Sequence, residues 1–167
     1  MNNIVLCGFM GCGKTTVGKL IAKALAFTFI DMDDYIVEQC GMSINQLFET
    51  YGEAHFRKLE TDTIRELSAR SELVIATGGG AVMRDENVEL LKAGGTLVYL
   101  EANAESVYER LKDDTTRPLL AVDNKRAKIE ELLAARIPRY RRVADLCVDG
   151  GGPAEQVADT IVKALSR

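Results

Sequence analysis

One glycine-rich stretch near the start of the chain constrains the fold more than any other, and it reads Gly8-Phe9-Met10-Gly11-Cys12-Gly13-Lys14-Thr15. It fits G-x-x-x-x-G-K-[ST], a phosphate-binding loop, and lies between an apolar run at 4–7 and apolar residues with helical spacing at 16–25. We expect its backbone N–H groups and the helix N-terminus to bind an anion. Lys14 would reach the β- and γ-phosphates, and the Thr15 hydroxyl would bind Mg²⁺. A glycine-rich turn without a ligand is the alternative.

Apolar runs alternate with helical patterns along the rest of the chain. This alternation predicts a doubly wound α/β fold of three layers, in which helices flank a five-stranded parallel sheet. The expected strands lie at 4–7, 27–30, 73–76, 96–100 and 146–148. The expected helices lie at 16–25, 34–39, 43–50, 53–69, 85–92, 104–111, 154–165 and from 125 onward, with a break or kink at Pro138.

The composition favours one globular domain that spans residues 1–167. The hydrophobic fraction is 47%, and the net charge of −4 argues against general affinity for nucleic acid. No apolar run approaches the roughly 20 residues of a membrane span, and the N-terminus lacks the features of a signal peptide. Four scattered cysteines have no metal-ligand spacing, which favours a reducing cytoplasm. Of these, Cys7 and Cys147 lie in strand-like runs and are expected to be buried.

Acidic residues follow the second strand, where an α/β sheet binds its ligands. Asp31 and Asp33 alternate by two, so both face the same way on an extended chain. One carboxylate could hold Mg²⁺ through water, and the other could orient and deprotonate a hydroxyl. The alternative is that Asp33 or Asp34 caps the next helix.

Four further stretches carry candidate ligand-binding residues. The glycines 78–80 follow the third strand and permit close approach of a ligand, although a tight turn is the alternative. Arg57 and Glu60 share a helix face, where an ordinary surface pair is the default. The aperiodic segment 112–124 is long enough to be a lid that delivers Arg117 to phosphates. The basic stretch 136–142 is either an anion site or a solvated face.

These motifs together resemble the shikimate kinase family, and the resemblance covers nearly the whole chain. It is carried by the phosphate-binding loop and by Asp31-Met32-Asp33, Phe56-Arg57-xx-Glu60, Thr77-Gly78-Gly79-Gly80, Arg117-Pro118-Leu119-Leu120 and Arg136-x-Pro138-x-Tyr140. The resemblance implies a P-loop kinase fold like that of the nucleoside-monophosphate kinases. It also implies transfer of the γ-phosphate of ATP to the 3-hydroxyl of shikimate, in aromatic amino-acid biosynthesis. ATP and Mg²⁺ would be required, and a cytoplasmic monomer is expected.

The resemblance also implies a role for individual residues. Lys14, Asp33 and Arg117 would be catalytic, with Asp33 acting as the base, and Thr15 and Asp31 would hold Mg²⁺. Shikimate would be bound by Asp33, Gly78, Gly79 and Gly80, with its carboxylate held by Arg57 and Arg136. The nucleotide would contact Gly11, Cys12, Gly13, Lys14, Thr15, Thr16, Arg110, Arg117 and Pro153. Glu60 could fix the rotamer of Arg57. Arg139 stands where a leucine is usual and adds a charge near the carboxylate site.

Two other functions fit parts of the pattern. One is a different small-molecule P-loop kinase, such as a gluconate or nucleotide kinase. The Arg57 and Arg136 pair with the triple glycine favours shikimate over these. The other is a nucleotide-dependent switch without catalysis, which would not need Asp33, Arg57 and Arg136.

Overall fold

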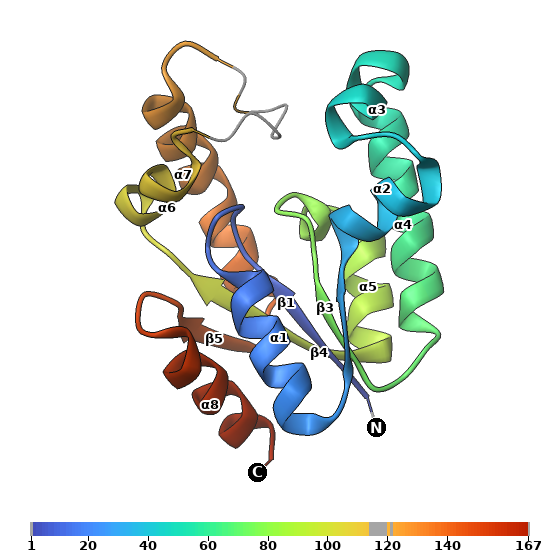
Figure 1. Ribbon diagram of the computed structural model, residues 1–167, viewed down its shortest axis with the longest axis vertical. Helices are drawn as coiled ribbons and strands as arrows, with labels where there is room; N and C mark the ends of the chain where they lie inside the picture. Colours follow the sequence, from blue (N-terminus) through green and yellow to red (C-terminus); the bar gives the residue numbers. More distant parts are fainter. Residues whose placement is uncertain (1, 114–119, 121, 167) are drawn as a thin grey trace.

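The computed structural model describes residues 2–113, 120 and 122–166. Its five strands form one parallel sheet in the order β2-β3-β1-β4-β5 (Figure 1). The strands are β1 (Asn3–Cys7), β2 (Thr28–Asp31), β3 (Leu73–Ala76), β4 (Gly95–Glu101) and β5 (Leu146–Asp149). The helices are α1 (Lys14–Leu25), α2 (Met32–Cys40), α3 (Ile44–Tyr51), α4 (Glu53–Ser68), η1 (Ala81–Met83, a 3-10 turn), α5 (Asp85–Gly94), α6 (Ala104–Leu111), α7 (Lys125–Val143) and α8 (Ala154–Leu165).

The two faces of the sheet bury different helices. Ile4 and Leu6 of β1 pack with α1 and α8, whereas Val5 and Cys7 pack with α4, α5 and α7. This alternation follows from the period of two along a strand. Central strands are covered on both faces, so their sequences are almost uninterrupted apolar runs. The predicted three-layer fold with a five-stranded parallel sheet is therefore confirmed.

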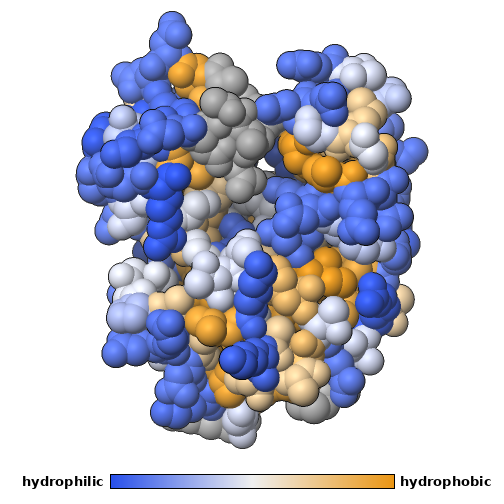
Figure 2. Space-filling model, in the orientation of Figure 1, coloured by the Kyte–Doolittle hydropathy of each residue, from blue (hydrophilic) through white to orange (hydrophobic). Residues whose placement is uncertain are grey.

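Two smaller clusters hold the parts that flank the sheet. Ile36, Leu47 and Phe56 join α2, α3 and α4. A second cluster, which includes Phe9 of the loop after β1, joins α6 and α7. Figure 2 shows mostly hydrophilic outer surfaces on the α6 side and the α3 side, with a hollow between them. No described helix is long and apolar enough to cross a membrane.

Two local expectations are wrong. Cys147 is exposed because it lies on the face of the edge strand β5 opposite to that of its buried neighbour Val148. Helix α7 does not break at Pro138 but continues to Val143, so the predicted break is wrong, while a kink at this residue stays a prediction. Its last turns bury Tyr140 and Val143 against the sheet, and this packing outweighs the hydrogen bond that the proline ring removes.

Candidate active site

The loop between β1 and α1 is built to receive an anion. Gly11 and Gly13 have φ values of 77° and 97°, which residues other than glycine rarely adopt. Gly13 is also the N-cap of α1, and no side chain caps that end of the helix. The first turn contains no acidic residue. The unsatisfied N–H groups and the positive end of the helix dipole therefore face the loop, as phosphate binding requires.

Two cations stabilise this loop through its carbonyl groups. The Nζ atom of Lys14 donates to the carbonyl oxygens of Gly8 at 2.7 Å and Phe9 at 3.0 Å. Arg110 of α6 donates to the carbonyl of Gly11 at 2.8 Å. Both cations thus lie against the loop that would hold a nucleotide. The Cys12 thiol is buried beside Lys14, with 3.7 Å between Sγ and Nζ.

A hydroxyl and a carboxylate meet where Mg²⁺ is expected. The Thr15 hydroxyl donates to Asp31 Oδ2 at 3.1 Å. Asp31 also caps α2, because its Oδ1 accepts from the Asp34 backbone N–H at 3.1 Å. The cap is therefore Asp31, not Asp33 or Asp34. Both groups are hard oxygen donors that suit Mg²⁺, which is commonly held by one or two protein ligands together with phosphates and water. The described residues offer no cluster of three or more His, Cys, Asp or Glu as an alternative metal site.

A cavity of about 400 Å³ joins the phosphate-binding loop to the ends of β2 and β3. It brings together Gly11, Cys12, Gly13, Lys14, Thr15, Thr16, Asp31, Asp33, Gly78, Gly79 and Arg110. Gly152 and Ala154 also line it, on either side of Pro153. Of the expected residues that the structure describes, Arg57, Gly80, Arg136 and Pro153 do not line this cavity. Arg117 lies outside the described residues.

The glycines 78–80 connect this cavity to the two arginines, because each lies against a different charged side chain. A Cβ atom at Gly78 would lie 2.7 Å from Glu60 Oε2 and 3.1 Å from Asp33 Oδ1. One at Gly79 would lie 3.1 Å from an Arg136 Nη atom, and one at Gly80 would lie 2.9 Å from both Arg57 Nη atoms. We call residues 77–81 the glycine loop. It brings the candidate base Asp33 and the two arginines to one place.

Glu60 is the residue whose environment differs most from expectation. Its side chain is fully buried and forms an ion pair with Arg57 at 2.7 Å, so the default of a surface pair is wrong. Burial raises the pKa of Glu60, while the Arg57 guanidinium opposes this shift. Burial also lowers the pKa of Arg57, but its pairing with Glu60 and Glu53 outweighs this and keeps it raised. Glu60 thus holds the Arg57 guanidinium at the glycine loop.

Two buried polar atoms beside the glycine loop have no hydrogen-bond partner among the described residues. Arg136 is 8% exposed and lies over the Phe9 ring, 5.6 Å from its centroid. Within the described residues, Arg136 Nη1 and Glu60 Oε2 have no hydrogen-bond partner. Such atoms are costly unless a ligand or water completes them. Arg139, in contrast, pairs with Asp85 at 2.6 Å and donates to the Val82 carbonyl, so its extra charge is matched.

The parallel sheet, the phosphate-binding loop and the adjoining polar site define a P-loop kinase that acts on a small acceptor molecule. The sequence model of a family described as "Shikimate kinase" matches residues 10–166. A shikimate kinase of Thermodesulfovibrio yellowstonii is 48% identical over 168 residues, which cover 100% of this chain and 96% of that protein. The chain therefore belongs to the shikimate kinase family. It is an ATP- and Mg²⁺-dependent kinase that phosphorylates shikimate, and the family resemblance is confirmed.

Solved structures agree with this assignment. A shikimate kinase from Acinetobacter baumannii, in complex with shikimate, has a TM-score of 0.96 at 41% identity and covers 99% of this chain and 93% of its own. A gluconokinase from Sinorhizobium meliloti reaches a TM-score of 0.58 at 17% identity, with 99% of this chain and 92% of its own covered. That second likeness shows the fold alone.

Proposed function

We propose that the residues around the glycine loop transfer the γ-phosphate of ATP to the 3-hydroxyl of shikimate. The observation that carries this proposal is the position of Asp33, which lines the same cavity as Lys14 and lies against Gly78. A hydroxyl bound at the glycine loop would therefore lie between a carboxylate and the phosphate-binding loop. This is the arrangement that phosphoryl transfer to an alcohol needs.

Each side chain has one task in the proposed reaction. Asp33 accepts the proton of the 3-hydroxyl. The hydroxyl oxygen forms the new bond to the γ-phosphorus, while the bond between that phosphorus and the oxygen of the leaving ADP breaks. Lys14 balances the negative charge on the transferring group. Thr15 and Asp31 would hold Mg²⁺, which neutralises phosphate charge when bound.

Arg57 and Arg136 hold the shikimate carboxylate in this proposal. Both guanidinium groups contact the glycine loop, at Gly80 and Gly79. A guanidinium presents a planar fork of N–H donors that matches a carboxylate. Arg136 Nη1 has no partner among the described residues, so it can donate to such a ligand. The acceptor would thus be fixed at both ends, by Asp33 at its hydroxyls and by the arginines at its carboxylate.

The organisation of the chain is also part of the proposal. Residues 1–167 would act as a single P-loop kinase domain, with 33–60 as the substrate-binding helical segment and 112–124 as the lid that carries Arg117. Arg110 and the loop at Pro153 would flank adenine. Gly150, Gly152 and Ala154, which line the cavity, support the second position. We further propose a cytoplasmic monomer that has no nucleic-acid partner.

A coupled assay tests the function with three sets of acceptors: shikimate, gluconate and nucleoside monophosphates. We expect turnover with shikimate only, and Lys14→Ala should nearly abolish it without changing the circular dichroism spectrum. Asp33→Asn should reduce kcat by about 10²–10⁴-fold, the range typical of a general base. A change in KM alone would make Asp33 a binding residue, and preferred turnover of gluconate would refute the acceptor assignment.

A further inference from the structure

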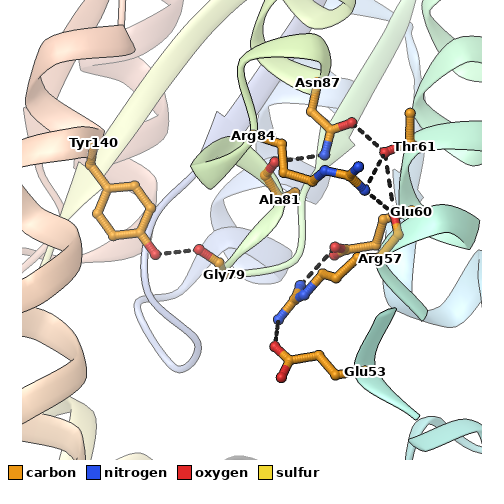
Figure 3. A network of polar contacts seen from close by, with 9 residues as sticks. All are labelled: Glu53, Arg57, Glu60, Thr61, Gly79, Ala81, Arg84, Asn87 and Tyr140. Carbon is orange, nitrogen blue, oxygen red and sulfur yellow. Dashed lines mark hydrogen bonds and ion pairs between the residues drawn. The ribbon is translucent and has the colours of Figure 1, made fainter. Parts of the chain in front are cut away.

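Two hydrogen bonds anchor the glycine loop from opposite sides (Figure 3). On one side, the Tyr140 hydroxyl of α7 donates to the carbonyl of Gly79. On the other side, Asn87 Nδ2 of α5 donates to the carbonyl of Ala81 at 2.8 Å. The two anchored carbonyls flank Gly80, so the loop is held at both ends of the segment that faces the arginines.

The Asn87 anchor continues into α4. Asn87 is fully buried, and its Oδ1 accepts from the Thr61 hydroxyl at 2.7 Å. Thr61 is also buried, at 5% exposure. Arg84 donates to the Thr61 hydroxyl at 3.4 Å and to the Arg57 carbonyl at 3.3 Å. Thr61, Asn87 and Arg84 therefore tie the backbone of α4 at Arg57 to the glycine loop.

The same spacing recurs on both helices. Thr61 follows Arg57 by four residues in α4, and Tyr140 follows Arg136 by four residues in α7. Residues four apart lie on one face of a helix, one turn from each other. Each helix thus carries an arginine to the glycine loop and, one turn later, a hydroxyl group that fixes the loop. In α7 the hydroxyl acts directly, and in α4 it acts through Asn87.

We propose that Thr61, Asn87 and Tyr140 are positioning residues that set the distance from the glycine loop to the Arg57 and Arg136 guanidinium groups. This inference rests on the proposed carboxylate clamp. The loop has no side chain of its own between Gly78 and Gly80, so its position depends on bonds to its carbonyl groups. A binding site tolerates errors of only about 0.5 Å in the placement of its groups. Shikimate affinity should therefore depend on hydroxyl groups that do not touch shikimate.

Isosteric variants test the two anchors. Tyr140→Phe removes one hydroxyl and keeps the ring that stacks on Tyr99, whose centroid is 4.9 Å away. Thr61→Val removes the other, while Thr61→Ser retains it. The matched control is Thr160→Val, which removes an exposed helical hydroxyl that donates to Gln156 of α8. The measurements are KM and Kd for shikimate, KM for ATP, and Tm.

We expect Tyr140→Phe and Thr61→Val each to raise Kd and KM for shikimate by about three- to tenfold, the loss typical of one hydrogen bond. KM for ATP should change by less than about twofold. Thr61→Ser should restore shikimate affinity, and Thr160→Val should match the wild type. If Thr61→Val does not fold, Tyr140→Phe alone tests the inference, and normal shikimate affinity in that variant would overturn it.

Two results would overturn the inference. One is normal shikimate affinity in both hydroxyl-deletion variants. The other is an equal rise in both KM values together with a lower Tm, which would mark a purely structural role. The proposed clamp is tested separately by Arg136→Lys. If that variant loses shikimate affinity while Tyr140→Phe and Thr61→Val do not, the positioning role alone fails. If Arg136→Lys binds normally, the clamp itself fails.

Discussion

Replacing Arg136 by lysine gives the most direct test of how the acceptor is held. Arg136 is 8% exposed, and its Nη1 atom has no partner among the described residues. Lysine keeps the positive charge but loses the planar fork, so one of two parallel hydrogen bonds to a carboxylate disappears. A hydrogen bond to a charged group contributes about 1.5–3 kcal/mol, which corresponds to an increase of roughly 10- to 150-fold in Kd for shikimate.

Arg57 should respond differently to the same change, because it already has protein partners. Its guanidinium pairs with Glu60 at 2.7 Å and Glu53 at 3.4 Å. A lysine there cannot maintain this set of bonds and still reach the ligand, and Glu60 is fully buried. Arg57→Lys should therefore lower both shikimate affinity and Tm, whereas Arg136→Lys should lower affinity with little change in Tm.

Isothermal titration with shikimate, its methyl ester and ADP would measure these effects. The exposed arginines Arg65 of α4 and Arg142 of α7 provide the lysine controls on the same helices. We expect the loss in Arg136→Lys to be large with shikimate and small with the ester, which lacks the carboxylate charge, and ADP binding should not change. Equal losses with acid and ester, or a loss of ADP affinity, would refute the clamp.

Two further changes probe the same site. Burial raises the pKa of Glu60 above its ordinary value of 4.5, so the folded state holds more protons than the unfolded state from that pH up to the folded pKa. Over this window the contribution of Glu60 to the free energy of unfolding falls as the pH rises. In urea titrations across pH 4–8, Glu60→Gln should therefore lack this fall. A difference in free energy of unfolding between the variant and the wild type that stays constant with pH would contradict this. Gly80→Ala should displace Arg57 and raise KM for shikimate by about tenfold or more, without loss of ADP affinity by titration.

The fold could be predicted from sequence because its signals are local. Each buried strand is a short apolar run, and Ser43 and Asn103 mark helix starts by the side-chain caps that the structure contains. The phosphate-binding loop is equally local, since all its atoms come from one stretch. Lys14 and Thr15 both line the cavity at this loop, and the roles predicted for them stay predictions.

The burial of Glu60 could not be predicted in the same way. Its neighbour Arg57 is three residues away, a spacing that usually marks an exposed pair. Glu60 is buried in part by Gly78, which comes from another part of the chain and lies against Glu60 Oε2. Asn87 and Thr61 were missed for the same reason, because they bond each other across a separation of 26 positions in the sequence. The one available signal was that Thr61 follows Arg57 by a single helical turn.

The two glycine-rich segments look alike in sequence but need glycine for different physical reasons. In the phosphate-binding loop, Gly11 and Gly13 have positive φ, so any side chain would strain the backbone itself. Gly80 has a φ of −97°, which other residues adopt readily, and it is glycine because the Arg57 guanidinium occupies the space of a side chain. The first segment uses glycine to shape a loop around phosphate. The second uses it to let charged groups from separate helices lie close to one stretch of backbone.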